Sequence, residues 1–281
     1  MSRTLGRPRT WAIRTSLSLL ALLLASCAGL PPPPPRTPVA PTVVSAARIE
    51  RLIVLLDQEW TRWGRIVNLV PVGTDTCVPH GDGYCDVIED GCGQEKTADL
   101  CPLVDGYWSS IRYRKIRHSC RRTDICEIQW PAGEPPPERT PPWSAAFVSA
   151  MMQRAGFSTT EFLPAPSHAD YVVAARDGFM SAFAVVATPA TVNPGDLICA
   201  VRGNSELTPD DIAQITDRQL ATPMHCDIVV RVDRGAHSLE AIGGNVQQTV
   251  AKSIVALDAV NQVRFDLNPD RPWVLVMRAR R

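Results

Sequence analysis

The sequence predicts an α+β protein in which helices come first along the chain and an antiparallel sheet comes last. Two observations predict it. Apolar residues recur at three- and four-residue intervals in several early segments, and short β-branched runs bounded by turn residues fill the last third. With 281 residues, 45% of them hydrophobic, the chain has enough material for one large or two small packed domains.

The charge of the chain argues against one class of partner. Its 29 basic residues are balanced by 29 acidic ones, so the formal net charge is zero. Phosphate backbones are bound through a basic excess, and none is visible here. Nucleic acid is therefore not an expected partner, and the sequence specifies no oligomeric state.

The N-terminal residues have the layout of an export signal. Residues 1–14 carry four arginines and no acidic residue, and an uncharged apolar run from Ser16 to Ala25 follows. The run is too short for a stable membrane span, and it ends in Leu-Ala-Ser-Cys, which resembles the lipobox of bacterial lipoproteins. Residues 1–26 are thus expected to be a lipoprotein signal peptide and Cys27 the lipidated N-terminus. The alternative is an ordinary signal peptide with a chance cysteine.

A proline-rich segment follows the expected lipid anchor. Residues 27–43 include seven prolines, five of them consecutive, which favours an extended polyproline tether. The position after the cysteine is Ala28 rather than aspartate, which by the sorting pattern of lipoproteins indicates the periplasmic face of the outer membrane. We therefore expect an exported, membrane-anchored protein whose folded part, residues 44–281, is a single domain.

Two helices are expected in the first half of the folded part. Seven apolar residues between Ile49 and Val67 recur at helical spacing with charged residues between them, which predicts one amphipathic helix of about 22 residues. A shorter helix is expected over residues 100–111, where Val104, Tyr107 and Trp108 share a face.

Eight cysteines remain once Cys27 is set aside, and an even number in an exported protein favours disulfides. They are Cys77, Cys85, Cys92, Cys101, Cys120, Cys126, Cys199 and Cys226. Because no two are spaced Cys-x-x-Cys, zinc is disfavoured, and no other metal or cofactor motif occurs. Six of them lie within residues 77–126, which predicts a disulfide-rich loop insertion whose pairing, one of 15, stays open.

The second half begins with helices and continues with strands. Helices are expected over Ser144–Ala155, with Ser144 as N-cap, over Ser167–Phe179, and from Thr208 to about Arg218. The expected strands are 196–201, 226–232, 238–242, 250–257 and 273–278, with a hairpin loop at 233–236.

Four strings within residues 143–246 together resemble one family. Trp-Ser-Ala-Ala-Phe-Val from Trp143, Pro-Gly-Asp-Leu from Pro194, His-Cys-Asp-Ile-Val from His225 and the strand ending at Asn245 are similar to motifs of CHAP domains, the cysteine, histidine-dependent amidohydrolases and peptidases. A Ser-bearing bacterial family of unknown function is the nearest version. The resemblance implies a papain-like fold, amide hydrolysis, often in peptidoglycan, and a peptidoglycan or peptide ligand.

The departure from the CHAP pattern is Ser144, which replaces the nucleophilic cysteine. A helix N-terminus can lower a thiol pKa into a usable range, but a hydroxyl must be deprotonated during attack by a neutral imidazole. The resemblance gives that role to His225, with Asn245 or else Asp227 orienting its ring. Alternation along a strand places His225 and Asp227 on one face and Cys226 on the other. The resemblance also makes the two strands neighbours, which implies a Cys199–Cys226 disulfide.

Each candidate also has a structural interpretation. Ser144 can be a helix cap, His225 a core histidine and Asn245 a turn residue, and His168 is expected to be structural rather than part of the cleft. Two functions follow. The first is a lipid-anchored amidohydrolase or peptidase of the cell envelope with a Ser144, His225 and Asn245 site. The alternative is an inactive CHAP-like lipoprotein that binds or scaffolds envelope partners.

Overall fold

The computed structural model of the protein describes residues 37–69, 99–111, 142–202, 206–216, 222–246, 248–268 and 271–281. Residues Thr37–Arg281 belong to one compact unit. The expected signal peptide, Cys27 and most of the Cys-rich insertion lie outside the described residues.

The described residues include α-helices α1 (Ala46–Arg62), α2 (Cys101–Trp108), α3 (Ser144–Arg154) and α4 (His168–Arg176), and the 3₁₀ helix η3 (Pro209–Gln214). Helix α1 buries its apolar face, and the Ser45 side chain caps its N-terminus by accepting a hydrogen bond from the Arg48 N–H. None of these helices combines the length and the apolar character that crossing a bilayer requires.

Helix α1 ends earlier than the apolar spacing predicted. Its last residue is Arg62, because Gly64 (φ +87°) and Arg65 (φ +59°) adopt left-handed conformations that a helix cannot continue through. The chain then turns, and Val67 belongs to strand β1 rather than to the helix. The expectation of about 22 helical residues was therefore wrong at its C-terminal end.

The other helices follow the sequence signals more closely. Gly156, at φ +92°, ends α3, and the Ser167 side chain caps α4 by accepting a hydrogen bond from the Ala169 N–H. The N-cap of α3 is Trp143, so Ser144 is the first residue inside the helix and not its cap. Its hydroxyl is thereby available for contacts outside the helix.

The strands of the described residues are β1 (Ile66–Leu69), β2 (Phe183–Ala187), β3 (Ala190–Thr191), β4 (Leu197–Val201), β5 (Met224–Asp233), β6 (Ser238–Val246), β7 (Thr249–Ala256), β8 (Gln262–Val263) and β9 (Trp273–Ala279). Seven form one sheet in the order β1-β7-β6-β5-β4-β9-β2, and β3 pairs with β8. The expected antiparallel meander is confirmed in β4 to β7, whereas β1, which pairs parallel to β7, and β2, β3 and β8 were not predicted.

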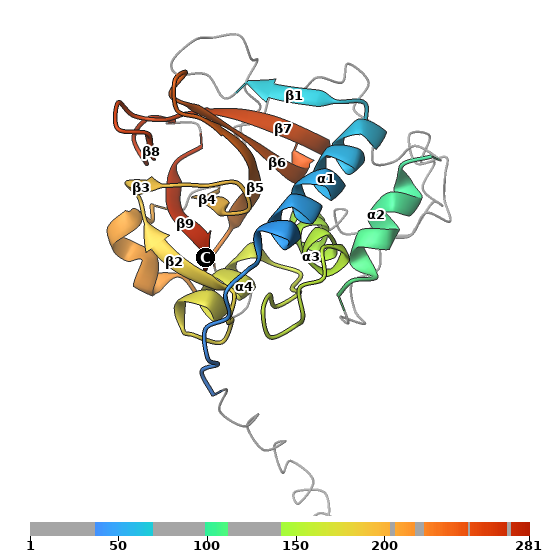
Figure 1. Cartoon of the computed structure of the whole chain (residues 1–281), viewed down its shortest axis with the longest axis horizontal. Coiled ribbons are helices and arrows are strands. Elements are labelled where there is room, and N and C mark those ends of the chain that lie inside the picture. Colours follow the sequence, from blue (N-terminus) through green and yellow to red (C-terminus); the bar gives the residue numbers. More distant parts are fainter. Residues whose placement is uncertain are drawn as a thin grey trace, which may run out of the picture. The chain divides into compact units, whose positions relative to one another are not determined.

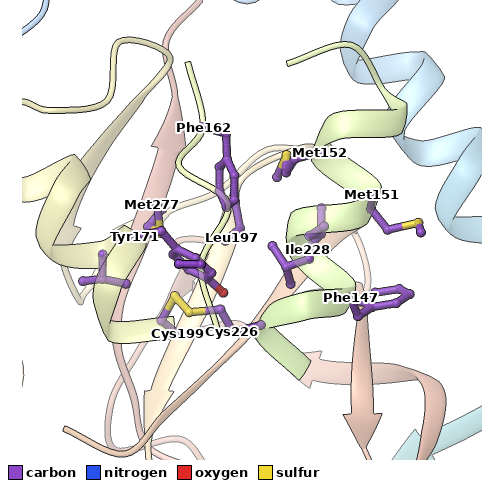
Figure 2. Packing of buried hydrophobic residues seen from close by; sticks show 14 of the residues in the cluster. Phe147, Met151, Met152, Phe162, Tyr171, Leu197, Cys199, Cys226, Ile228 and Met277 are labelled. Carbon is purple, nitrogen blue, oxygen red and sulfur yellow. A yellow bond between two sulfur atoms is a disulfide. The ribbon is translucent and has the colours of Figure 1, made fainter. Parts of the chain in front are cut away.

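Figure 1 shows helices α1, α3 and α4 beside a strongly curved sheet, with α2 outside α1 and α3. One buried cluster combines residues from all four helices with one face of the sheet, and a smaller cluster fills the other face, where β3 and β8 contribute Ala190 and Val263. Figure 2 shows part of the larger cluster, with Tyr171 on α4 and Phe147 on α3 around the strands. The fold is thus α+β with a mostly antiparallel sheet, as expected.

The residues just before α1 are attached along the body by backbone hydrogen bonds. The N–H groups of Val39, Thr42 and Val44 donate to the carbonyl oxygens of Gly178, Ser181 and Arg280, at 2.9, 2.8 and 2.8 Å. This stretch lies within the compact unit that begins at Thr37.

Candidate functional site

Ser144 opens the most completely buried helix of the described chain. Every residue of α3 from Ser144 to Met152 is buried, and the side chain of Trp143 before it stacks on Trp63 and Tyr107, with ring centroids 5.2 and 5.6 Å away. This packing fixes the first turn of α3 and leaves Ser144 only 2% exposed.

The hydroxyl of Ser144 meets an imidazole from the start of α4. Its Oγ lies 2.6 Å from Nε2 of His168, and the other ring nitrogen, Nδ1, contacts the hydroxyl of Tyr171 one turn further along α4. His168 is only 3% exposed. Because His168 directly follows the capping residue Ser167, the first turn of α4 presents the ring to the first turn of α3.

His168 is neutral at ordinary pH. Burial lowers its pKa well below the usual value, and the charge that His225 carries when it is protonated and the charge of Arg202 lower it further. Burial also raises the pKa of Tyr171, so its phenol stays protonated. When the proton of His168 is on Nδ1, it donates to the Tyr171 oxygen and Nε2 accepts from Ser144.

A second buried histidine, hydrogen-bonded to an aspartate, lies beside His168. Nε2 of His225, near the start of β5, is 2.7 Å from Oδ1 of Asp227, which confirms that these two residues share a face of the strand. The rings of His225 and His168 are in contact, with centroids 5.2 Å apart and planes tilted by 58°. Ser144, both imidazoles and the carboxylate therefore form one buried cluster.

Asp227 is ionised although it is fully buried. Burial by itself raises its pKa, but His225 and the Arg271 guanidinium outweigh it and hold the pKa below the usual value. Arg271 Nη1 donates to Oδ2 at 3.1 Å, and the Ser253 hydroxyl donates to the same oxygen at 3.4 Å. Burial lowers the pKa of His225 to about 4, against the opposing attraction of Asp227, so the ring is neutral and donates to the carboxylate through Nε2–H.

Strand β6 approaches this cluster through two glycines. A Cβ added to Gly243 would lie 1.7 Å from Asp227 Oδ1 and 3.2 Å from His225 Nε2, and one added to Gly244 would lie 2.4 Å from Cβ of Phe147. Any side chain at either position would push β6 away from the His225–Asp227 pair or from α3.

The predicted disulfide is confirmed beside the cluster. Cys199 and Cys226 are directly paired across β4 and β5, with an S–S distance of 2.10 Å and Cα atoms 4.1 Å apart. The neighbouring pair in the register is Ala200 and His225, so the disulfide joins the two strands next to the imidazole. Cys101 is disulfide-bonded as well.

The comparisons with known proteins identify the family but not its chemistry. Residues 107–279, more than half of the chain, match DUF2272, described as an uncharacterized protein conserved in bacteria. The chain belongs to this family. No curated protein and no solved structure is similar enough to the chain to count as a match.

The DUF2272 match includes the whole cluster. It begins within α2 at Tyr107 and ends with β9 at Ala279, so it contains Ser144, His168, His225, Asp227 and Arg271. Helix α1 and strand β1 lie outside the matched residues. The cluster is therefore a feature of the DUF2272 part of the chain.

The structure changes which of the predicted residues meet. Ser144 is hydrogen-bonded to His168, which the sequence had suggested was structural, and not to His225. His225 is held by Asp227, the second of the two orienting residues considered. Asn245 has φ +55° where β6 shifts register, and no side-chain hydrogen bond joins it to the described residues. Tyr171 and Arg271 were not singled out, and the position of His168 after a helix cap is the signal that could have identified it.

The side chains of the cluster are not arranged as a metal site. Among the described residues, no group of three or more histidine, cysteine, aspartate or glutamate side chains could hold a metal ion. What the residues do offer is a hydroxyl, two neutral imidazoles and one carboxylate, which are the groups used in acyl transfer.

Proposed function

We propose that the chain is a serine amidohydrolase or peptidase of the bacterial cell envelope, with a CHAP-like, papain-type arrangement and a lipid anchor on Cys27. One observation carries the proposal: Ser144 Oγ lies 2.6 Å from Nε2 of His168, on the first turn of a buried helix. A nucleophile within hydrogen-bond reach of a neutral, oriented base is the geometry that hydroxyl catalysis requires.

In the proposed reaction His168 takes the proton of Ser144 as Oγ attacks the amide carbonyl. The imidazolium then gives this proton to the leaving amine, the C–N bond breaks, and an ester forms on Ser144. Water cleaves the ester and regenerates the hydroxyl. Tyr171 has the orienting role, because its contact with Nδ1 keeps Nε2 directed at Ser144.

The N-terminus of α3 supplies the remaining component. The first N–H groups of a helix have no partner within it and lie at the positive end of the helix dipole. Those of Ser144, Ala145 and Ala146 would stabilise the oxyanion that forms when Oγ attacks. A single such donor can contribute about 3 to 4 kcal/mol to the transition state.

The proposed substrates are amides of peptidoglycan or of peptides. This follows from the resemblance to CHAP domains and from the expected location in the envelope. The carbonyl side of the cleaved amide would be the acyl group that esterifies Ser144.

The test uses the purified full chain with a fluorophosphonate probe, which labels activated serines, and with peptidoglycan, from which newly released amines are measured. We expect one probe adduct, on Ser144, and amine release that Ser144→Ala abolishes. His168→Gln should reduce labelling about 10²- to 10⁴-fold, the usual contribution of a general base.

The matched control is Ser149→Ala. Ser149 lies on the same helix and is fully buried, but within the described part of the chain its hydroxyl bonds only to backbone groups of Ala145 and Ala165. This variant should still be labelled on Ser144. Absence of labelling and amine release in the wild-type chain, or labelling that survives Ser144→Ala, contradicts the proposal.

A second candidate function is a non-catalytic one, in which the chain binds glycan or peptide or scaffolds an envelope partner. The burial of Ser144, His168 and His225, which are 2%, 3% and 0% exposed, favours it, because reacting groups must be reached by substrate. This function predicts that wild-type and Ser144→Ala chains bind peptidoglycan equally well and that neither releases amines.

The proposed anchor has its own test. The wild-type chain should incorporate radiolabelled palmitate and fractionate with membranes, and Cys27→Ala should abolish both. If Cys27→Ala still incorporates the label, the lipobox interpretation is wrong.

A further inference from the structure

The geometry points to a second general base in the cluster: we infer that His225 activates the water that cleaves the acyl-enzyme, while His168 activates Ser144. The inference rests on the proposed function. It assigns the two half-reactions to two different imidazoles, and the following observations support the division.

Nδ1 of His225 is an unused acceptor. The ring is completely buried, and this atom has no hydrogen-bond partner among the described residues. Leaving a buried polar atom unpaired usually costs about 1 to 3 kcal/mol, so such an atom calls for an explanation. A water molecule bound as a reactant is a partner that Nδ1 could accept from.

The tautomer of His225 is set by its neighbours. Arg271 holds Asp227 as a carboxylate, 3.1 Å from Nη1 to Oδ2, and an ionised carboxylate can only accept. The proton of the neutral ring must therefore be on Nε2, 2.7 Å from Oδ1, and the lone pair on Nδ1. This is the arrangement of a carboxylate-oriented base, with the lone pair on the side away from the carboxylate.

His168 is assigned to the acylation step because it contacts the nucleophile directly. Its Nε2 is engaged with Ser144 at 2.6 Å, and its Nδ1 is in contact with a neutral phenol. His225 has a carboxylate to stabilise the imidazolium that forms when it accepts a proton, which His168 lacks. Since the two rings are in contact, with centroids 5.2 Å apart, a water on Nδ1 of His225 would be close to the site of acylation.

The proposed deacylation hydrolyses the ester on Ser144. The water oxygen attacks the carbonyl carbon of the Ser144 ester while one water proton passes to Nδ1 of His225. The tetrahedral intermediate collapses, the bond from carbon to Ser144 Oγ breaks, and the proton on His225 returns to Oγ. The products are the free acid and the original hydroxyl, with both imidazoles neutral again.

The experiment separates the two half-reactions with p-nitrophenyl acetate and the full chain. The wild-type chain should release one equivalent of nitrophenol in a burst and then turn over. His225→Gln places an amide near the Nε2 position, able to donate to Asp227, but has no basic nitrogen. We expect it to keep the burst, lose about 10²- to 10⁴-fold in steady-state rate, and accumulate acetyl-Ser144 detectable by mass spectrometry.

The matched variant is His168→Gln, which should lose the burst itself. Hydroxylamine, which attacks esters without a base, should restore turnover in His225→Gln but not in His168→Gln. If His225→Gln loses the burst as His168→Gln does, or turns over at the wild-type rate, the division of roles is wrong. If the wild-type chain is not acylated at all, the proposed function itself fails.

A measurement on the wild-type chain covers the case in which His225→Gln does not fold. Acylation and deacylation are followed separately between pH 3 and 8, a range that includes the pKa of about 4 to which burial lowers His225. Two bases should give two midpoints, because the ring environments differ, whereas one shared base would give the same midpoint for both steps and overturn the inference.

Discussion

His168 and His225 show how two touching side chains can be given different chemistry. Both rings are buried and neutral, but one is oriented by the phenol of Tyr171 and the other by the carboxylate of Asp227. A carboxylate stabilises the protonated ring far more than a phenol does. The two imidazoles therefore differ in basicity although they lie in the same buried cluster.

The lowered pKa of His168 predicts how the labelling of Ser144 depends on pH in acid. A histidine acts as a base only while it is neutral. The rate of the proposed acylation therefore falls only when the pH drops below the pKa of His168 in the folded protein. We expect probe labelling of Ser144 to stay nearly constant from pH 8 to pH 6. A histidine with an ordinary pKa of about 6.5 would lose about three quarters of its rate at pH 6. A midpoint near 6.5 would show that His168 is not the base.

At the scale of residues the sequence identified most members of the cluster but not which histidine contacts Ser144. The motif strings located Ser144, His225 and Asp227, and strand alternation correctly put the last two on one face. The contact between Ser144 and His168 depends on how α3 packs against α4, and no local pattern encodes that packing. Ser144 also satisfied the rules for a helix cap, which fit the first helical residue equally well.

Strand β6 can contact the cluster only because it carries two adjacent glycines. Gly243→Ala would place a methyl group 1.7 Å from Asp227 Oδ1. Since the carboxylate is also held by Arg271, we expect the variant to lose about 1 to 3 kcal/mol in free energy of unfolding, as overpacking usually costs. Urea unfolding measures the loss.

The control for this substitution is Gly235→Ala in the β5–β6 turn. Its added Cβ would be in ordinary contact, 3.6 Å from Asp233 Oδ1, and the residue is exposed. The stability should change by no more than about 0.5 kcal/mol. Equal effects of the two alanines would show that β6 does not pack as closely as described.

The Cys199–Cys226 disulfide joins β4 to β5 across 27 residues of sequence. Closing a loop of this length restricts the unfolded chain and stabilises a protein by about 3 to 4 kcal/mol in the chain-entropy account. We expect the double variant Cys199→Ala, Cys226→Ala to lose about this much in urea unfolding without reductant. A loss below about 1 kcal/mol would mean that strand pairing alone fixes this part of the sheet.

At the scale of elements, the apolar periodicity predicted helix α1, but a glycine ends this helix earlier than the periodicity indicates. The apolar stripe of α1 continued in the sequence to Val67, but Gly64 ends the helix first, so the last expected turn became β1. Strand β2 was missed because its five residues show no polar alternation, and it is placed only by its pairing with β9. The β5-β6-β7 part of the meander was predictable because short turns separate strands that are neighbours in both sequence and space, whereas the connection from β4 to β5 is long and contains η3.

For the whole molecule, the buried histidines predict a loss of stability in acid. Burial lowers the pKa of His225 from 6.5 to about 4, so between these values the unfolded chain binds more protons than the folded one. Stability is therefore complete above about pH 6.5 and is lost as pH falls toward 4. His225 alone should account for about 2 kcal/mol between pH 7 and pH 5, and His168 shifts in the same direction.

Urea unfolding at pH 7 and pH 5 measures this loss. In His225→Gln the difference between the two pH values should shrink by about 2 kcal/mol, because the titrating group is gone. An unchanged difference would show that His225 is not buried as a neutral ring.

The backbone contact between Val44 and Arg280, 2.8 Å from N–H to carbonyl oxygen, has a consequence for engineering. It means that the residues leading into α1 adjoin the residues that follow β9, so a short linker could fuse them and the chain could be cut anew at an exposed hairpin such as 234–237. Such a circular permutant would keep every strand in its place while moving the two chain ends to the β5–β6 connection.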